Sequence, residues 1–290
     1  MTILVTGATG TVGRRVVEQL LERGERVRAL TRAPERAEFP PGVEVVGGDL
    51  EDPASLASAL RGVTGLHLIT FGGEFSAPLE TGDEILALAE EAGVRRVTVL
   101  HGGGDTPMET AVRESGFAWT VVMPVEFMAN ALEWAPGIRS EGVVREPFVD
   151  RLSAMVHESD IGAVAAVALT EDGHGGQEYL VTGPEALTVR DKTTAIGAAR
   201  GADVELVELT EEQALENWRG QGMPEDVIGF LIAVYRDTPP EGRTVLGTVE
   251  KVTGRPARTF AQWAGEHAHL FRAGPERSGD GALSEGTIEA

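Results

Sequence analysis

Three glycines at a spacing of three residues are the strongest chemical signal in the sequence. Gly7, Gly10 and Gly13 follow an apolar segment, residues 3–6, and lead into an amphipathic segment, residues 12–23. A glycine loop between a strand and a helix lets the backbone approach a pyrophosphate, which the amides at the helix N-terminus then bind. The spacing differs from Gly-x-Gly-x-x-Gly, but the position after the first strand supplies the context that a dinucleotide site requires. The predicted contacts are Gly7, Thr9, Gly10, Thr11, Val12 and Gly13.

The end of the second predicted strand, residues 27–31, indicates which dinucleotide binds. An NAD site places an acidic residue there for the ribose 2′-hydroxyl, whereas this strand ends in Thr31 and Arg32. Arg32 suits a 2′-phosphate, with Thr31 as a hydrogen-bond donor and Arg36 as a second cation, so the sequence predicts NADP(H). A solvated loop arginine is the alternative. After the third strand, Asp49 and Leu50 are predicted to hold the adenine, although Asp49 suits a turn equally well.

A histidine at the end of the fifth predicted strand is the candidate catalytic residue. His101 is expected at the carboxyl edge of the sheet, near the nicotinamide, where an imidazole can donate a proton at neutral pH. The sequence names no orienting partner, and a histidine bonded to nearby backbone is the alternative. The Tyr-x-x-x-Lys pair of conventional carbonyl reductases is excluded, because Lys192 and Lys251 have Thr188 and Gly247 four residues before them. The cofactor is therefore expected to supply the reactivity and the protein the orientation.

Residues after the fourth and sixth predicted strands are candidates for the walls of the reaction site. Thr70, Phe71 and Gly72 close the fourth strand and are predicted to line the ribose and nicotinamide, with core packing as the alternative for Phe71. The loop after the sixth strand supplies large apolar side chains and one amide, which suit a flat organic molecule. No metal site is predicted, because the chain lacks cysteine, and His267 and His269 face different sides of one predicted helix. The predicted substrate contacts are Pro124, Phe127, Met128 and Asn130.

An alternation of strands and helices positions these candidates. Apolar segments separated by helices of about 10–15 residues predict right-handed βαβ crossovers and a parallel sheet. The predicted fold class is α/β, a Rossmann-type parallel sheet with helices on both faces plus a smaller α/β substrate lobe. One helix is expected from Asp52, as N-cap, to Leu60, whereas residues 125–150 are expected to be irregular. The expected division is an NAD(P)-binding domain of residues 1–124 with 151–186, a substrate lobe of 125–150 with 187–272, and a disordered tail of 273–290.

Composition narrows the classes of protein further. The 290 residues carry a formal net charge of −21, which repels phosphate backbones and argues against nucleic acid or an anionic membrane as partner. The absence of cysteine excludes disulfides and thiol chemistry. No basic segment precedes the first strand, and no apolar stretch reaches the roughly 20 residues of a membrane helix. A cytoplasmic protein that binds a small-molecule substrate is expected, and association as a homodimer is left open.

Five later segments, together with the glycine loop, resemble the NmrA-like branch of the atypical short-chain dehydrogenase/reductase superfamily. This branch includes NAD(P)H:quinone reductases and redox-sensing regulators, and it generally lacks the Tyr-x-x-x-Lys pair as well. The resemblance extends over about residues 1–271, which is nearly the whole chain. The segments that carry it are 47–50, 115–130, 157–162, 179–188 and 253–260.

The leading hypothesis is an NADPH-dependent oxidoreductase that transfers a hydride to a small conjugated or quinone-like acceptor. Two alternatives stay open. One is a non-catalytic NADP(H)-sensing regulator, and the other is a redox-neutral enzyme on the same fold with His101 as acid or base. The second half of the chain offers no strong partner helix or DNA-reading element, which favours catalysis.

Overall fold

Seven parallel strands form the centre of the molecule. The computed structural model describes residues 1–72, 77–102 and 105–272. The strands lie in the order β10-β8-β7-β4-β1-β2-β3, and the direction in which the chain progresses across the sheet reverses between β1 and β4. All six pairings are parallel. The strands are β1 (Thr2–Val5), β2 (Arg26–Thr31), β3 (Glu44–Gly47), β4 (Gly65–Ile69), β7 (Arg96–Leu100), β8 (Ala118–Pro124) and β10 (Gln177–Val181).

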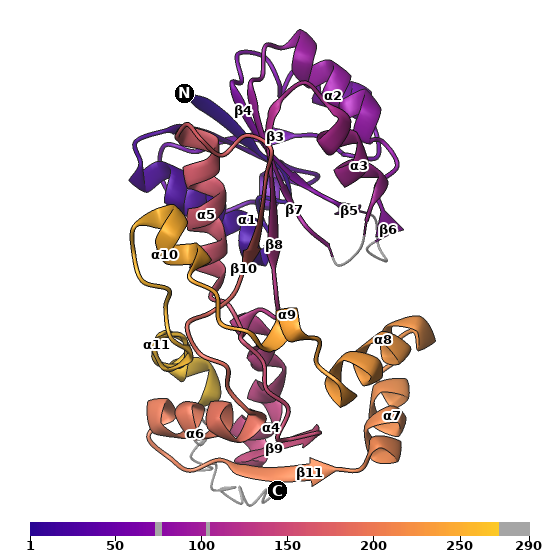
Figure 1. The fold of residues 1–290 in the computed structure, drawn as a ribbon, viewed down its shortest axis with the longest axis vertical. Helices are drawn as coiled ribbons and strands as arrows, with labels where there is room; N and C mark the ends of the chain where they lie inside the picture. Colours follow the sequence, from indigo (N-terminus) through magenta and orange to yellow (C-terminus); the bar gives the residue numbers. More distant parts are fainter. Residues whose placement is uncertain (73–76, 103–104, 273–290) are drawn as a thin grey trace, which may run out of the picture.

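Helices cover both faces of this sheet (Figure 1). On one face lie α1 (Thr11–Glu22), α5 (Glu158–Thr170) and α10 (Thr248–Thr253), and on the other α2 (Gly82–Glu91) and α3 (Pro107–Glu114). Val5 packs on the α1 and α5 side, whereas Leu68 packs on the α2 and α3 side. Because both faces are buried, the strands are apolar along most of their length. The Rossmann-type α/β prediction is confirmed.

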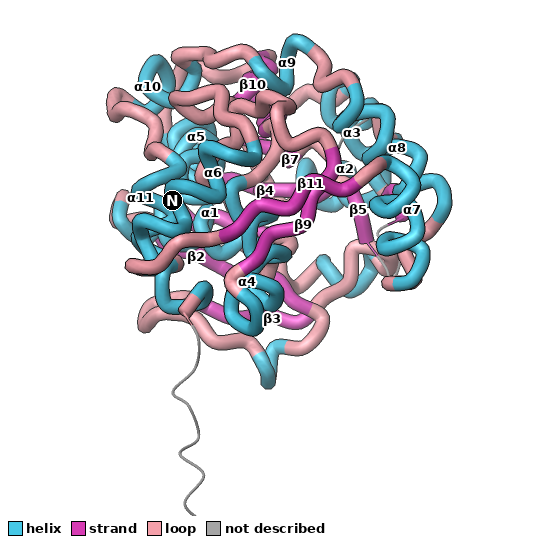
Figure 2. Tube along the Cα trace, turned by 90° about the horizontal axis from the view of Figure 1, so that it is seen from below, coloured by secondary structure: helices cyan, strands magenta, loops and turns pink. Residues whose placement is uncertain are grey.

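A second group of elements lies below the sheet in Figure 1 and contains its own short parallel pair, β9 with β11 (Figure 2). Its interior is apolar and includes Met128, Ile138, Phe260 and Trp263. The elements are η3 (Met128–Trp134), α4 (Ala135–Glu141), β9 (Val143–Pro147), α6 (Val189–Arg200), β11 (Glu205–Leu209), α7 (Glu211–Gly220), α8 (Glu225–Arg236), α9 (Pro240–Arg243), α11 (Phe260–Glu266) and η4 (Ala268–Phe271).

Residues 125–150 are more regular than predicted. Apolar residues Met128, Ala131, Ala135 and Ile138 recur at helical spacing and bury one side of the 3-10 helix η3 and of α4. Gly142 then takes a left-handed conformation, with φ of 72°, and ends α4 before β9 begins. The prediction of an irregular segment was wrong because Pro136 lies at the start of a helix and Gly142 ends it.

The expected helix over residues 52–60 was also wrong in length and in its cap. Only the 3-10 turn η2 (Pro53–Leu56) forms, and the Asp52 side chain caps nothing. The Ser55 hydroxyl instead donates to the Asp52 carbonyl and accepts from the Asp49 N–H. Such local side-chain bonds compete with a regular helix.

The remaining described elements are short. Phe71–Gly72 (β5) pairs antiparallel with Ala77–Pro78 (β6), and η1 covers Pro34–Arg36. The predicted tail, 273–290, lies outside the described residues. Within the described ranges, no helix has both the length and the apolar character needed to cross a bilayer.

Candidate active site

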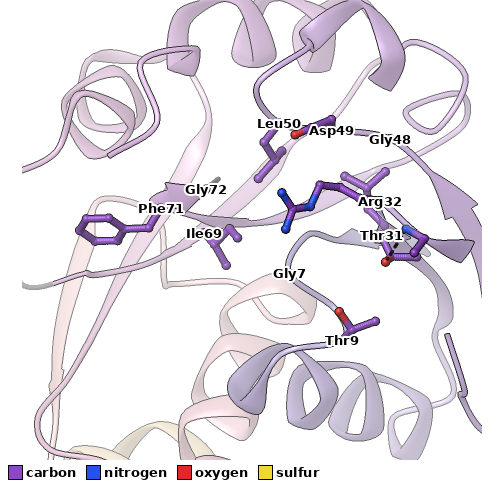
Figure 3. A pocket seen from close by; sticks show the side chains of 12 residues that line it. Gly7, Thr9, Thr31, Arg32, Gly48, Asp49, Leu50, Ile69, Phe71 and Gly72 are labelled. Atoms are coloured by element: carbon purple, nitrogen blue, oxygen red, sulfur yellow. Dashed lines mark hydrogen bonds between the residues drawn. The ribbon is translucent and has the colours of Figure 1, made fainter. Parts of the chain in front are cut away.

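A cavity of about 390 Å³ opens where β1 and β4 end, at the point where the strand order reverses (Figure 3). In open α/β sheets this crevice, outside the carboxyl ends of the strands, is where ligands bind. The residues around it come from the ends of four strands, β1, β2, β3 and β4. They are Gly7, Thr9, Leu30, Thr31, Arg32, Ala33, Gly48, Asp49, Leu50, Ile69, Phe71 and Gly72.

The glycine loop has the geometry of a phosphate cradle. Gly7 adopts a φ of 57°, in the left-handed region that favours glycine, and its carbonyl accepts from the Gly10 N–H at 2.9 Å. A Cβ on Gly13 would lie 2.1 Å from the Gly7 carbonyl oxygen, so only glycine allows α1 to start this close to the turn. The first amides of α1 have no intrahelical acceptor, and the first turn carries no acidic side chain. This loop therefore fits a dinucleotide pyrophosphate.

Not every predicted loop residue lines the cavity. Gly7 and Thr9 do, and the Thr9 carbonyl accepts from Arg14 Nε at 3.0 Å. The Thr11 side chain is exposed, and Val12 is buried in the core beneath α1. Gly10 and Val12 can reach a phosphate only through their backbone amides.

Arg32 directly follows β2 and lines the cavity. Its guanidinium extends into the cavity between Gly7 and Leu50 (Figure 3), and it belongs to none of the ion pairs found in the described chain. The Thr31 hydroxyl accepts from the Ala33 N–H at 3.2 Å, which fixes the turn after β2. Arg36 is not brought to this site, because its side chain is 85% exposed and lies 3.7 Å from Glu35.

Asp49 makes the turn considered for it and also lines the cavity. Its Oδ1 accepts from the Glu51 N–H at 3.0 Å, which makes a turn of the kind that aspartate favours. The same residue and the buried Leu50 line the cavity. The turn is confirmed, whereas the adenine contact stays a prediction.

A second cavity, of about 490 Å³, adjoins the first and shares Ile69 and Phe71 with it. Its walls come from the ends of β4, β7 and β8 and include most of the predicted nicotinamide and substrate contacts. Met128 is not among them, because its side chain is 1% exposed and packs in the apolar interior below. The lining residues are Ile69, Thr70, Phe71, Leu100, His101, Gly102, Pro124, Val125, Glu126, Phe127 and Asn130.

The structure supplies the orienting partner that the sequence did not name for His101. The imidazole Nδ1 lies 2.8 Å from Oε1 of Glu109, a carboxyl that is fully buried in the first turn of α3. Among the described residues, the ring bonds to this side chain rather than to backbone. The sequence signal was an acidic residue in the first turn of the helix that follows the histidine, but that position is also where glutamate stabilises any helix.

A buried polar cluster adjoins the second cavity and was not predicted. Glu126 lines the cavity and accepts from Arg151 at 3.1 and 3.3 Å and from the Ser153 hydroxyl at 2.5 Å. Lys192 Nζ donates to Ser153 at 2.9 Å, and the Arg151 guanidinium lies 3.7 Å from the centre of the Tyr235 ring. These groups come from four segments that are distant in sequence, so no local spacing of residues predicts the cluster.

Burial controls the charges in this cluster. It lowers the pKa of Lys192 to about 8, against the opposing pull of Glu126. Burial raises the pKa of Glu126, but the charges of Lys192 and Arg151 outweigh that effect and leave the pKa below its ordinary value. The carboxyl in the cavity wall is therefore ionised at neutral pH.

Known proteins similar to this chain bind NAD(P)H or act as reductases. Residues 7–107 match a family model described as NAD(P)H-binding. A (4-alkanoyl-5-oxo-2,5-dihydrofuran-3-yl)methyl phosphate reductase from Streptomyces griseus subsp. griseus is 42% identical over 93% of this chain and 99% of its own length. An NAD(P)H azoreductase from Xenophilus azovorans is 39% identical over 93% and 99%. A quinone oxidoreductase from Escherichia coli, solved with NADPH, has a TM-score of 0.77 and 26% identity over 94% of this chain and 100% of that one.

Proposed function

Since the chain belongs to the NmrA-like, NAD(P)H-binding reductases of the atypical short-chain dehydrogenase/reductase superfamily, we propose a reaction of that kind for it. The chain transfers a hydride from NADPH to a small, flat, conjugated acceptor. As a member of this family it is an NAD(P)H-dependent oxidoreductase. The observation that carries the finer proposal is the pair of adjoining cavities. The first, with the phosphate cradle, is called the cofactor cavity, and the second, with His101 in its wall, the acceptor cavity.

The proposed division of labour follows from this arrangement. When bound, the cofactor supplies a hydride to the acceptor. The glycine loop binds the pyrophosphate, and Phe71, which lines both cavities, separates the cofactor side from the acceptor side. Phe127 and Pro124 hold a planar acceptor against the nicotinamide and exclude water from it. His101 donates the proton that the reduced acceptor requires.

Arg32 supports NADPH rather than NADH as the working cofactor. The end of β2 carries a cation in place of the carboxylate that would accept from a ribose 2′-hydroxyl. An arginine can form paired, charge-assisted hydrogen bonds with a 2′-phosphate, which NADH lacks.

The relatives' names indicate what the acceptors have in common. A 4-alkanoyl-5-oxo-2,5-dihydrofuran, an azo compound and a quinone each contain an electron-poor double bond within a conjugated system. Hydride addition to such a bond leaves an anion stabilised to a different degree in each class. A mechanism without a tyrosine–lysine pair suits the quinone and the acylated dihydrofuranone best, because their developing charge is delocalised onto oxygen. Consistent with this, Tyr179 bonds to His174 and Tyr235 lies under Arg151.

The test is cofactor oxidation by a panel of acceptors, followed at the NADPH absorbance band by stopped flow. The panel contains a benzoquinone, an azo dye and an acylated dihydrofuranone, the last both with and without its phosphate. We expect turnover with at least one of them, and the highest kcat/KM identifies the acceptor class. A mixture without acceptor corrects for oxidation by dissolved oxygen. Tight NADPH binding with no turnover on any acceptor would contradict the proposal and favour the sensor.

A further inference from the structure

We propose that Glu109 is the positioning residue that orients His101 for proton donation into the acceptor cavity. The inference rests on the proposed function for the proton's destination, but the ring orientation that it requires is testable without turnover. His101 directly follows β7, and its backbone N–H donates to the Val122 carbonyl at 2.8 Å. The backbone of this residue is therefore fixed, and the position of its ring depends on its side-chain contacts.

The chain directly after His101 packs closely against Phe71. A Cβ on Gly102 would lie 1.8 Å from the Phe71 ring, so the glycine lets Phe71 pack directly against the chain after the histidine. The imidazole keeps 18% of its side-chain surface exposed and lines the acceptor cavity. Since Nδ1 is held by Glu109, the second ring nitrogen, Nε2, is the one left for the acceptor.

Glu109 is an unusual residue to bury for structural reasons alone. Its side chain is fully buried, and Oε2 has no hydrogen-bond partner in the described chain. The nearest cation, Arg113, lies 3.7 Å away and also pairs with Asp105 at 3.1 Å and Glu178 at 2.7 Å. A buried carboxylate that lacks full pairing opposes folding, so its presence is explained best by an interaction with the histidine.

The Glu109 carboxylate determines which nitrogen of the His101 ring carries the hydrogen. A carboxylate oxygen accepts hydrogen bonds, so Glu109 Oε1 holds the hydrogen of the ring on Nδ1. The doubly protonated ring gives its Nε2 proton to the acceptor anion and becomes neutral, with Nδ1–H still bound to Glu109. Solvent then returns a proton to Nε2. For each turnover, NADPH and one proton are consumed, and the acceptor gains a hydride and that proton.

The need for this proton should follow the basicity of the anion that the hydride leaves behind. Hydride addition to an azo bond leaves a strongly basic nitrogen anion, whereas a quinone leaves a weakly basic phenolate. General acid catalysis assists the more basic anion more strongly. An effect of Glu109 that grows from quinone to azo acceptor therefore reports on proton donation rather than on folding.

The kinetic test compares Glu109→Gln with Glu114→Gln, an exposed glutamate on the same helix. We expect Glu109→Gln to lower kcat for the azo acceptor by about 10–100-fold and for the benzoquinone by less than about 3-fold. The Kd for NADPH should stay within about 2-fold, and Glu114→Gln should behave as wild type. In a His101→Ala background, Glu109→Gln should have no further effect, because the two residues act as one unit. Equal losses on both acceptors, or additive losses with His101→Ala, would overturn the assignment.

A spectroscopic test needs neither cofactor nor activity. Nitrogen-15 NMR of the neutral His101 ring should show the hydrogen on Nδ1 in wild type, and Glu109→Gln should shift the ring toward the Nε2–H form. Wild-type protein with the hydrogen on Nε2 would overturn the proposal even if the variant did not fold. If no acceptor is turned over but the Nδ1–H form is found, the proposed function fails while the orientation by Glu109 stands.

Discussion

The cofactor cavity and the acceptor cavity adjoin, yet they are built in different ways. The cofactor cavity takes its shape from backbone at the ends of β1, β2 and β3, with Gly7 and Gly13 making the close approach. The acceptor cavity takes its chemistry from side chains, including His101 and Glu126, which are held by residues on other elements. Backbone recognition depends on a short local pattern, whereas side-chain recognition depends on tertiary packing.

The difference predicts where the molecule tolerates substitution. A backbone site fails when a side chain fills it, because main-chain atoms cannot move independently of the sheet. A side-chain site fails in parts, because each residue contributes separately and neighbours can adjust. Substitutions on the cofactor side should therefore have larger effects than substitutions of equal size on the acceptor side.

The largest effect is expected for Gly13→Ala. The added Cβ would lie 2.1 Å from the Gly7 carbonyl oxygen, so α1 and the glycine turn must separate and the phosphate cradle must open. We expect the Kd for NADPH, measured by calorimetry, to rise more than roughly 100-fold, with a loss of about 1–3 kcal/mol in unfolding free energy. Gly229→Ala is the control, since a Cβ there meets nothing within 4 Å. Unchanged NADPH binding by Gly13→Ala would show that the loop does not hold the phosphates.

The next effect tests which cofactor the same cavity selects. Arg32→Ala should weaken NADPH binding by about 1.5–3 kcal/mol and leave NADH binding nearly unchanged. Only NADPH has a 2′-phosphate, so only NADPH loses a contact with the guanidinium. Arg36→Ala is the matched control, since its side chain is 85% exposed and does not line the cavity. Equal losses for both cofactors in Arg32→Ala would remove Arg32 from 2′-phosphate recognition.

The same contrast explains how much of the site was predictable. The sheet, the glycine loop and the position of Arg32 follow from contiguous residues whose geometry is fixed by the strand-to-helix turn. Glu109 was missed because a glutamate in a first helical turn has an ordinary structural role, and only packing brings it to His101. Met128 was misplaced because the segment after β8 is helical, so neighbouring side chains point in different directions.

Lys192 illustrates why buried polar groups were beyond the sequence. It stands in an ordinary helix opening, after Thr188 and Asp191, which form a capping box, and such positions are normally solvated. In the fold its side chain is 1% exposed, because Ser153 and Glu126 from other segments provide the polar partners that permit burial. Partners this distant in sequence are invisible to spacing rules.

Because Lys192 is buried, we predict that the unfolding free energy depends on pH. This effect arises from the polar cluster beside the acceptor cavity. Burial lowers the pKa of Lys192 from 10.5 to about 8, so between these values the unfolded chain binds more protons than the folded one. The unfolding free energy therefore rises with pH across that window. Relative to Lys192→Met, wild type should gain about 2 kcal/mol between about pH 7 and pH 9.5 in urea unfolding. Lys251→Met removes the exposed lysine of α10 and is the control. The difference in unfolding free energy between wild type and Lys251→Met should not change with pH. A difference between wild type and Lys192→Met that does not change with pH would show that the buried amine does not titrate in this range.

The smallest expected effect is a change in KM on substitution of Phe127. It tests whether residues of the acceptor cavity contribute separately to acceptor binding. Phe127 lines the acceptor cavity, whereas Met128, the next residue, packs in the interior below. Phe127→Leu keeps an apolar wall but removes the ring that stacks on a planar acceptor, so KM for an aromatic acceptor should rise about 5-fold, or about 1 kcal/mol, with kcat little changed. Met128→Leu is nearly equal in volume and should leave KM unchanged. If Met128→Leu raised KM as much as Phe127→Leu, the acceptor would reach the interior of the second group of elements, and the boundary drawn between the cavity and that interior would be wrong.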